Sequence, residues 1–103
     1  GNERPVFAEN GLDVLSYRRI GKEQQYRKLT LSSNGTMVDA LYFGDGDAMD
    51  RDITGAFGEG ELAKALSGQK NQIRLDIVYD PDINEYNGVR SIQAKIKKYR
   101  VRL

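Results

Sequence analysis

Apolar and polar residues alternate along most of this chain, which is the pattern of half-buried β-strands. In the first half of the sequence, the alternation predicts strands at residues 12–20, 25–33 and 36–44. Leu29 and Leu31 of the second run are expected to face the core. Asn34-Gly35 separates the second run from the third, and this dipeptide favours a two-residue turn because both residues tolerate positive φ. The two runs are therefore predicted to pair as a hairpin.

The second half of the sequence predicts one short helix and two further strands. Apolar residues recur at helical spacing within residues 59–66, and Gly68 follows as a helix stop. The strands are expected at residues 71–80 and within residues 84–101, where Asn87-Gly88 supplies a second turn signal. These elements bring the predicted total to five strands and one helix.

The last strand contains a break in its alternation. Ile92, Ala94 and Ile96 occupy even positions, whereas Tyr99, Val101 and Leu103 occupy odd positions. One face of a strand can hold both sets only where a residue is inserted. A β-bulge or a strand end is therefore predicted near Lys97 and Lys98. The pattern assigns no face to the cations Lys98, Arg100 and Arg102.

Residues 44–55 are rich in Gly and Asp and are predicted to form a solvated loop. The Asp residues in this segment raise the alternative of a calcium-binding loop. An EF-hand that begins at Asp45 needs Gly at its sixth position and Glu at its twelfth, where this chain has Asp50 and Ala56. The segment is therefore not expected to bind calcium.

Three strands, a loop with one helix and a final hairpin are the element order of the OB-fold. We therefore predict an all-β, five-stranded antiparallel Greek-key barrel with one short helix, formed by residues 12–103 after an extended lead-in at residues 1–11. The main alternative, an SH3-like barrel, is not expected to carry a helix of this length there. OB-folds bind oligonucleotides or oligosaccharides on strands 2 and 3 and on two adjoining loops.

The composition fits one small domain and removes most familiar active sites. The chain has 103 residues, no Cys and no His. These absences exclude disulfides, thiolate and imidazole metal ligands, and catalysis by histidine. The sequence has no apolar run long enough to cross a bilayer and no signal-like start, so a cytoplasmic location without membrane contact is expected.

The net charge of +1 conceals an uneven distribution of charge along the chain. Residues 39–66 hold two Lys or Arg against seven Asp or Glu, whereas residues 67–103 hold eight against four. Between Arg90 and Arg102 there are six basic residues and no acidic one. The fold can therefore gather positive charge on one surface, which is what binding to a nucleic acid requires.

Four motifs resemble the C-terminal OB domain of RecJ, a bacterial exonuclease specific for single-stranded DNA. GNERPVF at residues 1–7 resembles its lead-in, Gly-Asn-x-x-Pro-Val-Phe, and YRKLTL at 26–31 resembles its second strand, His-Leu-Lys-Leu-Thr-Leu. VDALYFG at 38–44 is similar to its third strand, Leu-Asp-Ala-Ile-Ala-Phe, and NEYNGVRSIQAKI at 84–96 is similar to its closing Asn-Glu-Trp/Tyr-Asn-Gly-x-x-Ser-x-Gln-x-x-Ile. The resemblance spans nearly the whole chain, although Tyr26 and Arg27 replace the His and Leu of the second strand.

The resemblance implies that the chain is part of a 5′–3′ exonuclease that acts in DNA recombination and repair. The DHH motifs of that family, which bind metal and cleave phosphodiesters, are absent from this sequence. The chain is therefore expected to bind single-stranded DNA without cutting it and without a cofactor, beside catalytic domains of a parent chain that would hold Mn or Mg ions. The alternative is a protein-docking or structural barrel that contacts those domains or a repair partner.

An OB barrel would place ten residues of this chain where they could contact single-stranded DNA. Its cations would pair with phosphates, and its tyrosines would stack on bases. The candidates are Arg18, Arg19, Lys22, Tyr26, Lys28, Tyr86, Arg90, Gln93, Lys95 and Lys97. Three further aromatic residues, Phe43, Phe57 and Tyr79, are instead expected in the core.

Overall fold

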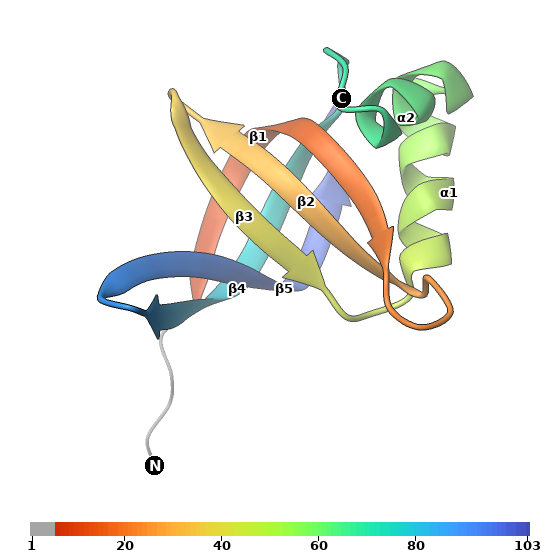
Figure 1. The fold of residues 1–103 in the computed structure, drawn as a ribbon. Helices are drawn as coiled ribbons and strands as arrows, with labels where there is room; N and C mark the ends of the chain where they lie inside the picture. The colour runs from red at the N-terminus through yellow and green to blue at the C-terminus, as the bar shows by residue number, and fades with distance from the viewer. Residues whose placement is uncertain (1–5) are drawn as a thin grey trace.

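The computed structural model describes residues 6–103, except for the side chains at positions 83, 84, 86, 90 and 91. This part of the chain forms five strands and two helices (Figure 1). In chain order they are β1 (Phe7–Ile20), β2 (Tyr26–Ser33), β3 (Thr36–Tyr42), α1 (Gly46–Phe57), α2 (Glu59–Leu66), β4 (Arg74–Tyr86) and β5 (Val89–Val101). Because β1 begins at Phe7 rather than Leu12, residues 7–11 belong to the barrel.

The strands close into a barrel in the order β1-β2-β3-β5-β4, with β4 returning to pair with β1. Neighbouring strands are antiparallel except for a short parallel contact between β3 and β5. This is the arrangement of the OB-fold, so the predicted five-stranded barrel is confirmed. Figure 1 shows both helices on one side of the barrel and the β4–β5 hairpin projecting on the other side.

Both predicted hairpin turns are present. Asn34 and Gly35 have φ angles of 51° and 83°, and Asn87 and Gly88 have φ angles of 52° and 77°. Positive φ at both central residues is the geometry of a type I′ turn, which matches the twist of the flanking strands. The two-residue loop fixes the register of β2 against β3.

The core consists of the inward residues of the strands and one face of each helix. Phe57 and Tyr79 pack against this core, as predicted. Its buried members are Leu12, Val14, Tyr17, Leu29, Leu31, Ala40, Met49, Ile53, Leu62, Ala65, Ile73, Leu75, Ile77, Ala94 and Ile96.

The predicted loop at residues 44–55 is wrong, because most of this segment is α1. The side chain of Asp45 accepts a hydrogen bond of 3.1 Å from the backbone N–H of Ala48 and so caps the first turn. Met49 and Ile53 lie one turn apart on the helix, and both are fully buried. The burial of this apolar stripe outweighs the high content of Gly and Asp.

The predicted break in the last strand is a β-bulge. Val78 of β4 pairs with Lys98, whereas the next residue, Tyr79, pairs with Ile96. Lys97 is therefore the extra residue of β5. Because of this insertion, Ile96 before the bulge and Tyr99 after it both pack on the core.

Candidate nucleic-acid interface

A row of three cations crosses the outer face of four neighbouring strands. Arg18 pairs with Lys28, Lys28 pairs with Leu41, and Leu41 pairs with Lys95. Residues that pair directly project from the same face of a sheet. The barrel thereby brings together Arg18 of β1, Lys28 of β2 and Lys95 of β5, which the sequence predicted as phosphate contacts. Leu41 supplies apolar surface between the last two.

An aromatic pair lies beside this row, where β2 begins and β3 ends. The rings of Tyr26 and Phe43 meet edge to face, with their centroids 5.1 Å apart. Phe43 is 51% exposed, so the prediction that it belongs to the core is wrong. An exposed ring next to cations is the arrangement that stacks a base while phosphates are neutralised.

The sequence held a signal for Phe43 that the core prediction overlooked. The two-residue turn at Asn34-Gly35 makes Ser33 pair with Thr36, and counting outward along both strands sets Arg27 opposite Tyr42. The next pair along is Tyr26 with Phe43. The exposed partner of Tyr26 therefore follows from the turn length and the strand register.

Carboxylates border the cation row on the side away from the aromatic pair. The adjoining row runs through Thr30, Asp39 and Gln93, and Asp39 is exposed. Asp82 of β4 lies 3.6 Å from the ammonium of Lys95. A half-exposed ion pair of this kind contributes about 0–1 kcal/mol, so Lys95 can exchange it for a phosphate at little cost.

Arg19 does not join the cation row. The register of β1 shifts between Val14 and Ser16, and beyond that irregularity Arg19 pairs with Arg27 rather than projecting beside Arg18. Its guanidinium donates to the carboxylate of Asp50 on α1 at 3.1 Å. The structure therefore gives Arg19 a contact with the helix.

Arg27 is fully buried at the end of the barrel, beneath the start of α1. Its Nε and Nη2 each donate to one carboxylate oxygen of Asp50 at 3.0 Å. Its Nη1 donates to the backbone oxygens of Gln24 and Tyr26 at 2.7 and 2.8 Å. The hydroxyl of Tyr17 donates to the same Asp50 carboxylate at 2.5 Å. This network fastens α1 to β1 and β2.

The electrostatics of the network follow from these contacts. Burial opposes ionisation of the Asp50 carboxyl, but hydrogen bonds from Arg27, Tyr17 and Arg19 outweigh it and hold the pKa of Asp50 below its ordinary value. Burial, reinforced by the hydrogen bond to Asp50, raises the pKa of Tyr17 far above its ordinary value. Asp50 is therefore ionised and Tyr17 neutral at pH 7.

Three other acidic side chains in and next to α1 also have partners. Asp45 caps the helix, Asp47 accepts from Arg27 at 3.2 Å, and Asp52 accepts from the hydroxyl of Tyr99 at 2.5 Å. Much of the negative charge predicted for residues 39–66 thus stabilises the attachment of α1. Asp39 of β3, by contrast, is exposed and borders the cation row.

The remaining predicted contacts lie around this surface. Lys22 is exposed in the loop between β1 and β2, and Lys97 is exposed at the bulge of β5. In the β4–β5 hairpin the backbone of Tyr86 pairs with Val89 and that of Arg90 pairs with Glu85. The side chains of Tyr86 and Arg90 lie outside the described part of the structure. Both loops flank the β2–β3 face, as the OB-fold requires.

Neither a metal centre nor a membrane span is found in the described part of the chain. No group of three or more potential metal ligands is close enough there to hold an ion. No helix within residues 6–103 has the length and apolar content needed to cross a bilayer.

Comparison with known proteins agrees with the fold and with the motifs. A search of curated proteins gave no match. The family model described as the RecJ OB domain matches residues 1–98, which include all five strands except the end of β5 at residues 99–101. An OB barrel of this kind is a binding module rather than a catalytic one. The chain therefore belongs to the RecJ OB domain family.

Proposed function

We propose that this chain holds single-stranded DNA across β2 and β3, as the OB module of a 5′–3′ single-strand-specific exonuclease of recombination and repair. The observation that carries the proposal is the row of Arg18, Lys28 and Lys95 beside the Tyr26–Phe43 pair. Cations attract the phosphates of a DNA strand whatever its base sequence. Each base stacked on an aromatic ring adds about 1–3 kcal/mol to the binding free energy. Binding is therefore expected to show little sequence preference.

In this proposal the barrel grips the substrate and other domains of the parent chain cut it. Those catalytic domains would hold the Mn or Mg ions, so the isolated chain should bind DNA without cleaving it. The cytoplasmic location expected from the sequence belongs to the same proposal.

Fluorescence anisotropy with labelled oligo-dT tests the proposal directly. The wild-type chain should bind, and log Kd should depend linearly on log salt concentration. Lys28→Ala should weaken binding and reduce the salt slope by about 0.7, the value for one phosphate contact on a single strand. Lys70→Ala, which removes an exposed cation between α2 and β4, is the matched control. Absence of salt-sensitive binding at micromolar protein would overturn the proposal.

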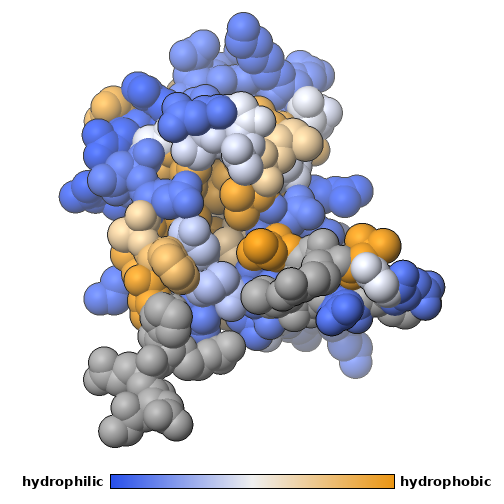
Figure 2. Space-filling view, turned by 90° about the vertical axis from the view of Figure 1, so that its left-hand side faces the viewer, coloured by the Kyte–Doolittle hydropathy of each residue, from blue (hydrophilic) through white to orange (hydrophobic). Residues whose placement is uncertain are grey.

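A second candidate function, docking to another protein domain, is favoured by the projecting β4–β5 hairpin. Val89 and Ile92 are 68% and 61% exposed there, although Ile92 follows the apolar alternation of β5. Figure 2 views the side from which the hairpin projects and shows apolar patches among hydrophilic surface. If docking is the function, the parent's other domains should pull down the wild-type chain but not Ile92→Ser. Neither the wild type nor Ile92→Ser should then show detectable oligo-dT binding.

A further inference from the structure

The bulge at Lys97 gives β5 an unbroken line of outward cations. Before the bulge, Ala94 and Ile96 are buried and Lys95 points outward; after it, Tyr99 packs on the core. The insertion therefore keeps every Lys and Arg in this stretch on the outside. They are Lys95, Lys97, Lys98, Arg100 and Arg102.

Asp76 fixes the two arginines at the end of this line. Nε and Nη2 of Arg100 donate to one carboxylate oxygen of Asp76 at 3.1 and 2.8 Å, and Nε of Arg102 donates to the other at 2.6 Å. The backbone N–H of Gly11 completes the set at 2.7 Å. One negative charge thus orients two guanidinium groups, and the cluster keeps a net positive charge.

These contacts also keep Asp76 ionised. Hydrogen bonds from Arg102, Arg100 and the Gly11 N–H outweigh the effect of burial and hold the pKa of Asp76 well below its ordinary value. The outer N–H groups of both arginines make no hydrogen bond to any described residue. Arg100 is 74% exposed, so its free edge is open to an anion.

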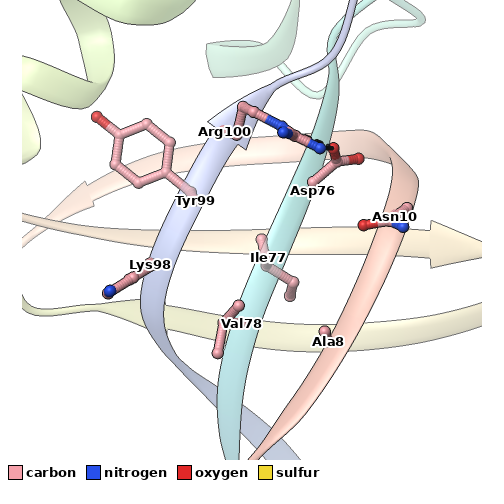
Figure 3. Close-up of a pocket in the computed structure, with 8 residues that line it drawn as sticks. All are labelled: Ala8, Asn10, Asp76, Ile77, Val78, Lys98, Tyr99 and Arg100. Carbon is pink, nitrogen blue, oxygen red and sulfur yellow. Dashed lines mark hydrogen bonds and ion pairs between the residues drawn. The ribbon is translucent and has the colours of Figure 1, made fainter.

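A hollow of about 200 Å³ lies beside this cluster on the outer face of β1, β4 and β5 (Figure 3). Its floor is apolar and includes Ala8 and Val78, and its rim carries Asn10 and Arg100. In Figure 3 the Lys98 side chain extends from β5 on the side away from β4. A flat apolar floor with an amide and cations at its edge suits an unpaired base and its phosphates.

We propose that this face is a second binding surface for the same DNA strand, with phosphates on Lys98 and Arg100 and a base in the hollow over Val78. The inference rests on the function proposed for β2 and β3, and it extends the path of the bound DNA strand around the barrel. Continuity comes from β5, because it pairs with β3 through Gln93–Lys95 and with β4 along its length.

The spacing of the cations favours a nucleic acid over a protein partner. Outward residues on a regular strand recur about every 6.6 Å, twice the rise per residue, and the bulge brings Lys97 and Lys98 closer together than that. A polyanion with regularly repeated charges can occupy such a line at several positions, whereas a folded protein domain would contact it through a few separate groups. The surface that the proposal describes is therefore a path along β5.

Oligonucleotide length separates the two surfaces experimentally. Labelled oligo-dT of about 4 and about 16 nucleotides brackets the site sizes of OB-folds. The variant Lys98→Ala/Arg100→Ala should bind the short oligonucleotide like the wild type. For the long one its affinity should fall several-fold, and its salt slope should drop by about 1.4, the sum of two single-strand phosphate contacts.

The matched control is Arg51→Ala/Lys70→Ala, which removes two exposed cations from α1 and from the segment before β4. It should bind both oligonucleotides like the wild type. Unchanged binding of the long oligonucleotide by Lys98→Ala/Arg100→Ala would overturn the second surface, as would an equal loss for both lengths. The β2–β3 proposal fails separately, when the wild type does not bind the short oligonucleotide or Lys28→Ala leaves its affinity unchanged.

Discussion

Replacing Asp50 by Asn tests whether the buried charge of Arg27 holds α1 on the barrel. Asp50→Asn keeps the shape of the side chain but removes the negative charge that both Nε and Nη2 of Arg27 contact. Removing one partner of a buried ion pair costs about 3–5 kcal/mol, because the other charge is left uncompensated. The Asp50 side chain is 17% exposed and Asp47 still reaches Arg27, so we expect about 3 kcal/mol, the lower end of that range.

The loss is large enough to measure in a chain of this size. For a domain of 60–100 residues, each kcal/mol lowers Tm by about 4–8 °C, so Asp50→Asn should lower it by roughly 12–24 °C. Urea unfolding followed by circular dichroism gives the free energy of unfolding independently.

Asp47→Asn is the matched control on the same helix. The Asp47 side chain is 80% exposed and makes a single contact of 3.2 Å with Arg27, so its loss should cost about 0–1 kcal/mol. Equal losses below about 1 kcal/mol for both variants would refute the reasoning, because Arg27 would then not depend on a specific counter-charge.

Three further predictions concern other parts of the barrel. Gly46→Ala should destabilise the chain, because its new Cβ would lie 2.5 Å from Nη1 of Arg27. A Cβ added at Gly55 on the same helix would have no atom within 4 Å, so Gly55→Ala should raise the free energy of unfolding in urea by about 0.5–1 kcal/mol. Because the folded-state pKa of Asp76 is depressed, its stabilising effect is present above the ordinary Asp pKa of about 3.9 and is lost as the pH falls below it; Asp76→Asn should flatten the acid limb of a stability-against-pH curve. Phe43→Ala should weaken oligo-dT binding about 5- to 150-fold in anisotropy titrations, the equivalent of 1–3 kcal/mol of stacking, and an unchanged affinity would exclude a base on this ring.

The strands were predictable because their two signals are local. Alternation of period two marked each strand, and the Asn-Gly dipeptides marked both hairpins; α2 was predicted at its observed bounds. The helix α1 was missed because Gly and Asp at its start are typical of loops. Its signals were the cap Asp45 and the apolar residues Met49, Ile53 and Phe57 at intervals of four.

The site was predictable where it depends on regular strands and unpredictable where a strand is irregular. Lys28 and Lys95 follow from alternation on β2 and β5, and both lie in the observed row. Arg19 follows an irregularity in β1, so alternation could not predict its contact with Asp50. The buried counter-charge of Arg27 depends on packing between distant segments, which a period in the sequence does not encode.

The bulge at Lys97 lets one strand carry two opposite phases of its alternation. If β5 kept all its residues but paired without a bulge, Tyr99 and Val101 would turn out to solvent, and Lys98 and Arg100 would face the barrel. Deleting Lys97 would instead place Lys98 directly after Ile96. The pairs Val78–Lys98 and Tyr79–Ile96 would then be consecutive, and each residue of β5 would keep its face. Lys97 is therefore the position at which an engineer could shorten this barrel by one residue without exchanging the two faces of the strand.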